Sequence, residues 1–285
     1  MKCKLISLLF LLTIKIIPAV FANETINVIA TKFPNGDLLE VVKPILKQNG
    51  YNLEIKEIPS YSGHGIVTVR GNISQEINDP NQQVFAGKSD ANFFQPAIYL
   101  EEYNKLHEAD LTNIGKVFYI PFAIYLSPNH KVESASIASL ADKHEGMTVG
   151  IPYNYIDASR ALKLLEVAKL IELDKSKKIS SLTDVSANPY HLHIVQVDNE
   201  ILPQLLLSNS LDMVVMNSGR AYLKNLLPSA SSLLENNPDV YSNVVVTTKV
   251  SSTDPKFKAL VNALNSPQVR QYIEKNYQGT VKPSF

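Results

Sequence analysis

Hydrophobic and polar positions change their period repeatedly along the chain, and these changes predict an alternation of strands and helices. Residues 25–31, TINVIAT, and 51–59 have the period of strands, and the amphipathic stretch 37–50 between them predicts a helix that ends at Gly50. We predict further strands at 147–152, 191–198, 211–217 and 241–249, and helices from Pro80 towards Gly87 and at 96–109, 136–144, 157–173, 199–210 and 254–277. This alternation indicates an α/β fold with largely parallel sheets.

Two segments depart from the alternation. Residues 115–128 are apolar but contain Pro121, which cannot donate to a central ladder, so two strands that meet at a bend are predicted. This bend and the late strand at 241–249 are the two predicted crossings between lobes. Residues 60–78 are rich in Gly and Ser and are predicted to form a loop or hairpin excursion.

The first 22 residues predict a secretory signal peptide that is cleaved after Ala22. Lysines precede an apolar run, and small residues come before the cleavage site. Lys15 interrupts the run; a retained membrane anchor is the alternative, although the run is short for a membrane span. Cys3 is the only cysteine of the sequence, so the mature chain would contain no disulfide and no catalytic thiol.

Composition narrows the range of partners. The chain has 285 residues, of which 45% are hydrophobic, enough for one large domain or two lobes. Its formal charge is zero, and removal of the three lysines of the signal would leave 24 basic and 27 acidic side chains, a charge of −3. No basic stretch recurs, so a small molecule rather than a nucleic acid is the predicted partner.

The sequence offers little for catalysis or metal binding. It contains no G-x-S-x-G, Walker or G-x-G-x-x-G pattern. His191 and His193 would share one face of a strand and could supply half of a metal site. No second cluster of histidines and carboxylates has metal-ligand spacing. We therefore favour the interpretation that the two histidines lie at a solvated strand end and bind no metal. We therefore predict no enzyme activity, no catalytic residue, no cofactor and no bound metal.

Five segments resemble, in their order and spacing, the MetQ/NlpA-type substrate-binding proteins of methionine ABC importers. They are SDANFFQPAIYLEEYNK, GKVFYIPFAIYLS, VGIPYNYIDASRALKLLEVAKLIEL, SANPYHLHIVQVDNEILPQLL and VVMNSGRAYL, and the resemblance covers roughly residues 26–277. It implies a type II-like periplasmic binding protein: two α/β lobes with an amino acid, L- or D-methionine, held in the cleft and delivered to a membrane permease that a separate ATPase subunit drives. The predicted lobes are 23–118 with 244–285, and 119–243, and we expect a monomer.

Arg160 and Asn217 are the strongest candidates for contacts to an amino acid. Arg160 follows a strand and would lie in the first turn of the next helix, where free N–H groups favour an anion and a guanidinium can bind a carboxylate through two parallel hydrogen bonds. Asn217 ends a buried strand, and its amide can bridge a zwitterion. The resemblance implies ligand contacts at both positions. The alternatives are a surface arginine and an asparagine that caps the turn at Ser218. If both line an open cleft, their removal would weaken binding with little effect on stability.

Aromatic residues are expected to form the side-chain pocket. Phe93, Phe94 and Tyr99 surround Gln95, and Phe118 and Tyr119 come from the first crossing strand. Aromatic rings suit a thioether, because each contact between sulfur and a ring is worth about 0.3–1.5 kcal/mol. The alternative is that most of these rings are core residues. The resemblance to the family adds Gln95 to the candidate ligand-binding residues.

Three departures from the family pattern affect the ligand assignment. Pro96 replaces a histidine, Ile120 replaces a tyrosine, and Asp157 replaces an asparagine three residues before the arginine. Asp157 could pair with the ligand ammonium or simply cap the helix. Alternative ligands are therefore another amino acid or a short methionine-containing peptide. A second alternative is an exported interaction protein or enzyme that reuses the fold.

The predicted cleavage site also differs from that of the family. Its members are typically lipoproteins that are anchored through a cysteine directly after the cleavage site, where this chain has Asn23. The sequence therefore predicts a periplasmic protein that diffuses freely.

Overall fold

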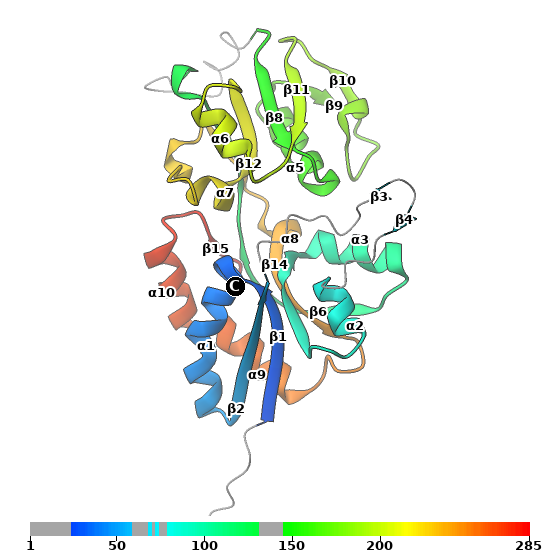
Figure 1. Cartoon of the computed structure of the whole chain (residues 1–285), viewed down its shortest axis with the longest axis vertical. Coiled ribbons are helices and arrows are strands. Elements are labelled where there is room, and N and C mark those ends of the chain that lie inside the picture. The colour runs from blue at the N-terminus through cyan, green and yellow to red at the C-terminus, as the bar shows by residue number, and fades with distance from the viewer. Residues whose placement is uncertain (1–23, 59–67, 70–71, 74–78, 131–144) are drawn as a thin grey trace, which may run out of the picture.

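The computed structural model describes residues 24–58, 68–69, 72–73, 79–130 and 145–285. The predicted signal peptide, most of the 60–78 excursion and the helix predicted at 136–144 lie outside the described residues. Figure 1 shows two α/β lobes, one above the other, each built on its own sheet. The two-lobed α/β prediction is confirmed.

The first lobe is built on a six-stranded sheet with the order β15-β6-β14-β5-β1-β2. As the opening of the sequence predicts, β1 (Glu24–Thr31) runs parallel to β2 (Tyr51–Ile58), and the helix α1 (Asp37–Gln48) connects them. The other strands are β5 (Ala91–Pro96), β6 (Leu111–Tyr119), β14 (Ser242–Thr248) and β15 (Lys282–Pro283). The other helices are α2 (Pro80–Phe85), α3 (Ala97–His107), α9 (Pro255–Leu264) and α10 (Pro267–Asn276). A short hairpin pairs β3 (Thr68–Val69) with β4 (Asn72–Ile73).

The second lobe is built on a five-stranded sheet with the order β11-β8-β12-β7-β13. Its strands are β7 (Phe122–Leu126), β8 (Thr148–Pro152), β11 (His193–Val197), β12 (Met213–Asn217) and β13 (Leu233–Leu234). Its helices are α5 (Tyr155–Val167), α6 (Leu202–Leu207) and α7 (Ser218–Tyr222), and a small ribbon pairs β9 (Glu172–Leu173) with β10 (Val185–Ala187). His191 precedes β11 in a left-handed conformation, at φ 48°, so it does not share a strand face with His193.

Both sheets are mixed, so the prediction of largely parallel sheets is wrong. In the first sheet β14 runs antiparallel to β5 and to β6. In the second sheet β7 runs antiparallel to β12 and to β13. The physical reason is the connectivity: β7 and β14 are the strands that follow a crossing, and each enters its sheet from the opposite lobe.

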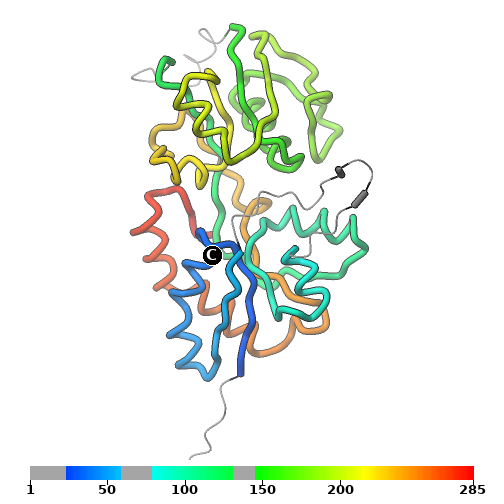
Figure 2. The backbone as a smooth tube through the Cα atoms, in the orientation of Figure 1, coloured from blue at the N-terminus to red at the C-terminus, as the bar shows by residue number. Residues whose placement is uncertain are grey.

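The two crossings lie side by side between the lobes (Figure 2). The first is the bend at Ile120 and Pro121, where β6 ends and β7 begins, as Pro121 predicts. The second leads from β13 through the short helix α8 (Pro238–Tyr241) into β14. Tyr119 pairs with Ser242 in the first sheet, so both residues stand in the first lobe, whereas the predicted boundaries place them just inside the second.

The helix α5 begins two residues earlier than predicted. Asn154 is its N-cap, because its side chain accepts hydrogen bonds from the N–H groups of Ile156 (3.0 Å) and Asp157 (3.1 Å). The prediction of Asp157 as the N-cap is therefore wrong, and Arg160 lies in the second turn rather than the first. The apolar face of α5 packs on the second sheet, where Leu162 and Leu165 are fully buried.

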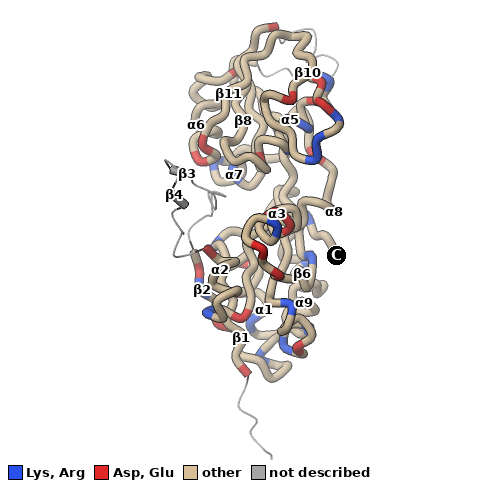
Figure 3. Tube along the Cα trace, turned by 90° about the vertical axis from the view of Figure 1, so that its right-hand side faces the viewer, with Lys and Arg blue, Asp and Glu red and all other residues tan. Residues whose placement is uncertain are grey.

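Charged residues of both signs are interspersed over the two lobes (Figure 3). Within the part of the chain that the structure describes, no helix is both long and apolar enough to cross a bilayer.

Candidate functional site

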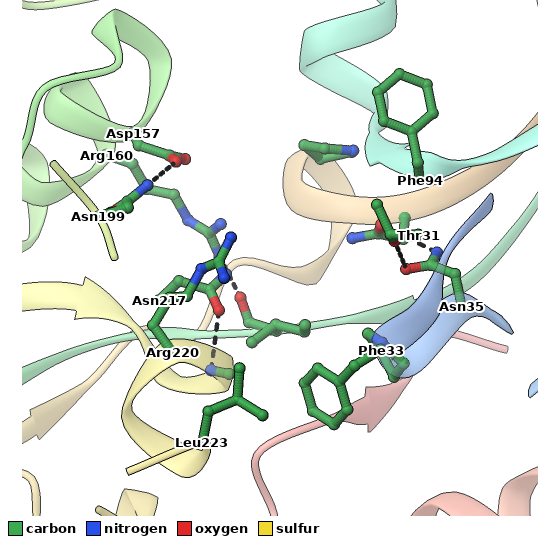
Figure 4. A pocket seen from close by; sticks show the side chains of 15 residues that line it. Thr31, Phe33, Asn35, Phe94, Asp157, Arg160, Asn199, Asn217, Arg220 and Leu223 are labelled. Atoms are coloured by element: carbon green, nitrogen blue, oxygen red, sulfur yellow. Dashed lines mark hydrogen bonds between the residues drawn. The ribbon is translucent and has the colours of Figure 1, made fainter. Parts of the chain in front are cut away.

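A cavity of about 170 Å³ lies between the two lobes. The first lobe lines it with Thr31, Phe33, Pro34, Asn35, Phe94, Pro96 and Asn243. The second lobe lines it with Asp157, Arg160, Asn199, Asn217, Gly219, Arg220 and Leu223, and Ile120 contributes from the first crossing. Figure 4 shows the polar side chains of the second lobe facing Phe94, Thr31 and Phe33 across the cavity.

Strand ends place most of these residues. Thr31 is the last residue of β1, and Asn217 is the last residue of β12. Asn199 follows the end of β11. Ligands of α/β sheets bind beyond the carboxyl ends of the strands, and here the strand ends of both lobes face the same cavity.

Arg160 is buried and held by the second lobe itself. Its Nε donates to both carboxylate oxygens of Glu235, at 2.8 and 2.9 Å. Its Nη2 donates to Glu235 and, at 2.7 Å, to the carbonyl oxygen of Ile120. The guanidinium also lies over the rings of Phe122 and Tyr241, 4.3 and 4.0 Å from their centroids. Only Nη1 has no partner among the described residues, so two parallel hydrogen bonds from the Nε edge are not available to a ligand.

Glu235 is a residue that the sequence reasoning missed. It follows β13 on the second crossing and is buried. Besides Arg160, it accepts a hydrogen bond at 3.0 Å from the N–H of Phe122, directly after the first crossing. Because it lies 75 residues from Arg160 in the chain, no local motif could have revealed the pair.

Asp157 and Asn199 form a second polar group on the same wall. The Nδ2 of Asn199 donates to Oδ2 of Asp157 at 3.1 Å. Burial raises the pKa of the Asp157 carboxyl above its ordinary value, and the nearby charges of Arg160 and Arg220 and the Asn199 hydrogen bond oppose this. Asn199 was not predicted, although its place directly after a strand is the same signal that identified Asn217.

Asn217 and Arg220 lie close together at the start of α7. Oδ1 of Asn217 caps this helix by accepting a hydrogen bond from the N–H of Gly219 at 2.9 Å, which leaves its NH₂ group for other partners. A Cβ at Gly219 would lie 2.8 Å from that same oxygen, so the close approach requires glycine. Nη1 of Arg220 forms a salt bridge with Glu200 at 2.7 Å.

Four of the nine predicted ligand residues line the cavity: Phe94, Asp157, Arg160 and Asn217. Phe94 owes its position to an irregularity in β5. Val244 pairs with Gln95 and Val245 with Phe93, so Phe94 is left unpaired at a bulge. Bulges redirect a side chain, and this one turns Phe94 towards the cavity.

The other five predicted residues do not lie at the cavity. Phe93 and Phe118 are fully buried in the first-lobe core, with ring centroids 5.6 Å apart. The rings of Tyr99 and Phe94 pack in a T-shaped arrangement with centroids 6.0 Å apart, and Tyr99 is not among the residues that line the cavity. Gln95 is buried in an amide network with Asn81 and Asn92, and Tyr119 pairs within the first sheet. These rings and this amide serve packing and strand pairing, as the alternative reading of the aromatic residues expects.

Comparison with known proteins covers almost the whole chain. A family model described as NlpA lipoprotein matches residues 26–285. A methionine-binding lipoprotein MetQ of Bacillus subtilis (strain 168) is 30% identical over 268 residues, which are 92% of this chain and 88% of that relative. The structure of a nutrient binding protein from Burkholderia cenocepacia bound to methionine has a TM-score of 0.74 at 26% identity, covering 91% of this chain and 100% of that chain. A periplasmic substrate-binding protein of an ABC transporter from Coxiella burnetii has a TM-score of 0.73 at 28% identity, with coverages of 91% and 100%. The resemblance inferred from the sequence is confirmed.

These similarities overturn the predicted localisation. The matching family and the Bacillus relative are lipoproteins, a class of protein that is attached to a membrane through a lipidated cysteine. The prediction of a periplasmic protein that diffuses freely is therefore wrong. Cys3, the single cysteine of the sequence, lies outside the described residues.

Proposed function

The chain belongs to the NlpA lipoprotein family, and from this premise we propose that it is the substrate-binding component of an ABC importer. It binds methionine in the cavity between its lobes and delivers it to a membrane permease, which a separate ATPase subunit drives. The role is binding rather than catalysis. The names of the Bacillus, Burkholderia and Coxiella relatives support this proposal.

The observation that carries the proposal is the position of the Arg160 guanidinium. Glu235 and Ile120 fix it in place, and its Nη1 group remains for a ligand at the cavity. A fixed cationic donor in a partly desolvated cavity suits a carboxylate, because hydrogen bonds between charged groups are stronger than neutral ones. The NH₂ group of Asn217 is a second donor for the same carboxylate.

The apolar side chains of the cavity suit the rest of a methionine. Phe33 and Phe94 come from the first lobe, and Leu223 comes from the second lobe. Aromatic and aliphatic walls favour burial of a thioether, and contacts between sulfur and rings add to this.

A second candidate ligand is another amino acid or a short methionine-containing peptide. The observation that favours it is the polar group on the first-lobe wall, where Oγ1 of Thr31 donates to Oδ1 of Asn35 at 2.9 Å and Asn35 donates to Asn243 at 3.5 Å. Amides and hydroxyls at this place would suit a polar group beyond the α-carbon.

Native mass spectrometry of protein purified without added ligand, followed by calorimetry with a panel of amino acids and methionine dipeptides, tests the proposal. We expect methionine to bind in the micromolar range or more tightly, and a dipeptide or polar amino acid to bind better if the second candidate is right. If no member of the panel binds, the proposed function is wrong. The same spectra test the expected monomer, since a dimer would have twice the mass.

A further inference from the structure

The strand β5 carries two buried amides on one face of the sheet, although a regular strand would place them on opposite faces. Asn92 and Gln95 lie three residues apart, and successive side chains of a regular strand alternate between the two faces. Nevertheless, Nε2 of Gln95 donates to Oδ1 of Asn92 at 3.2 Å. The bulge at Phe94 explains this contact, because one extra residue shifts the alternation by one position.

The pairing of β5 with β14 places the two amides on the same face. Asn92 pairs with Val246, and Gln95 pairs with Val244. The two valines lie two residues apart in β14 and belong to one buried cluster, which also contains Val84 of α2. Because directly paired residues lie on one face of a sheet, both amides face α2.

Asn81 on α2 joins the two amides into one network. Its Oδ1 accepts hydrogen bonds from Nδ2 of Asn92 at 2.9 Å and from Nε2 of Gln95 at 2.5 Å, and its Nδ2 donates to Oε1 of Gln95 at 2.9 Å. Nδ2 of Asn92 also donates to the carbonyl oxygen of Pro80 at 3.3 Å. The three amide side chains are fully buried, and each of their nitrogens and oxygens has a hydrogen-bond partner.

A strand without the bulge would break this network. Residue 94 would then pair with Val244, and Gln95 would turn to the opposite face, towards the core that contains Phe118. A buried amide without a partner is costly, and the amide of Asn81 would lose its bonds to Gln95 as well. The network therefore favours the bulged strand over the regular one.

We propose that Asn81, Asn92 and Gln95 are positioning residues of the binding site, which hold the bulge in β5 and thereby turn Phe94 towards the cavity. None of the three lines the cavity, so they act on a ligand through Phe94. The effect on a ligand rests on the proposed function, whereas the effect on the position of Phe94 does not.

Fluorescence tests the position of residue 94 without a ligand. The sequence contains no tryptophan, so Phe94→Trp introduces a single fluorophore at the bulge. In this protein, Asn81→Leu removes the hydrogen bonds of the network and should change both the emission maximum and the quenching by acrylamide. The matched control is Asn104→Leu, which removes two hydrogen bonds to Leu111 in the same lobe, away from the cavity, and should change neither.

A double-mutant cycle measured by calorimetry tests the effect on binding. Asn81→Leu should weaken methionine binding by up to about tenfold, the same loss as Phe94→Ala, because both remove the contact of this ring with the ligand. It should cause no further loss in the Phe94→Ala background, and Asn104→Leu should leave the affinity unchanged in both backgrounds. Gln95→Met keeps the length of the side chain without its hydrogen bonds, and it takes the place of Asn81→Leu if that variant does not fold.

Two results would overturn the inference. One is an emission spectrum of the folded Asn81→Leu protein that matches that of the control, because the network would then not position residue 94. The other is an equal loss of affinity with and without the Phe94 ring, because the network would then not act through this ring. If the parent protein binds no member of the amino-acid panel, the proposed function fails, and the emission spectra still decide whether the network positions residue 94.

Discussion

The two walls of the cavity differ in kind. Among the described residues that line the cavity, all charged side chains lie on the second-lobe wall, namely Asp157, Arg160 and Arg220. The first-lobe wall carries aromatic rings, amides and a hydroxyl, with Phe94 and Thr31 among them. Both arginines are held by carboxylates of their own lobe. The difference teaches that the charged groups of the second-lobe wall are fixed by their own lobe before any ligand arrives. Under the proposed function, this wall would bind the charged end of the ligand, and the first lobe would define the shape and polarity of the remainder.

The largest expected effect comes from removing the most buried charge of the second-lobe wall. Arg160→Ala leaves the Glu235 carboxylate buried and unpaired, and breaking a buried pair costs about 3–5 kcal/mol. We therefore expect a clear fall in the free energy of unfolding of the ligand-free protein, measured in urea, as well as a loss of binding. This corrects the expectation that Arg160 could be removed with little effect on stability.

The double variant Arg160→Ala with Glu235→Gln is the control, since it removes both charges. It should regain part of the stability and none of the binding. If Arg160→Ala is as stable as the parent protein, the pair of Arg160 and Glu235 contributes nothing to the free energy of unfolding. The distinction between a charged, preorganised second-lobe wall and an uncharged first-lobe wall would then lose its main support.

Two neighbouring rings of the first lobe sharpen the comparison. Phe93→Ala removes a fully buried core ring and should cost about 3–5 kcal/mol of stability. Phe94→Ala removes a ring at the cavity and should cost less stability. It should weaken methionine binding up to about tenfold, because a contact between sulfur and a ring is worth about 0.3–1.5 kcal/mol. Chemical denaturation and calorimetry separate the two effects. Equal losses of affinity in both variants would contradict the assignment of Phe94 to the cavity and of Phe93 to the core.

Two asparagines that cap helices separate capping from binding. Asn154 caps α5 and Asn217 caps α7, but only Asn217 lines the cavity. Replacement of either by alanine should cost about 1 kcal/mol of stability through loss of the cap. Only Asn217→Ala should also weaken ligand binding. If Asn154→Ala weakens binding as much, the effect of Asn217 acts through helix stability rather than through contact with the ligand.

The smallest expected effect is a dependence of stability on pH. The folded-state pKa of Asp157 is raised by burial, so the charged carboxylate destabilises the ligand-free protein, and this penalty disappears as the pH falls through the raised pKa. Asp157→Asn should therefore raise the melting temperature at neutral pH, and its advantage over the parent should shrink on acidification. Melting curves at several pH values measure this. A variant less stable than the parent at neutral pH would mean that the arginines outweigh burial.

The sequence was informative where local pattern decides the structure. The period of residues 25–59 predicted the β-α-β opening, and Pro121 predicted the first crossing. Position at a strand end identified Asn217 and would have identified Asn199. These features depend on neighbours in the chain.

The features that could not be predicted depend on contacts between residues that are far apart in the sequence. Glu235 reaches Arg160 only because the second crossing folds back against α5. The bulge at Phe94 arises from the register between β5 and β14, whose segments are far apart in the chain. Asn and Asp are both preferred at the N-cap of a helix. Only the backbone conformation shows that Asn154, and not Asp157, caps α5.

The attachment of Arg160 to both crossings has a consequence for motion. Its guanidinium binds the carbonyl of Ile120 on the first crossing and Glu235 on the second, and Glu235 in turn binds the N–H of Phe122. In a rotation of one lobe against the other, displacement grows with distance from the axis. If the rotation axis passes through the crossings, Arg160 lies near this axis, where the displacement of atoms is smallest. A ligand carboxylate bound to Arg160 would keep this contact while the lobes open and close. The parts of the walls that lie farther from the axis would move more, and they would contact the rest of the ligand only when the lobes close.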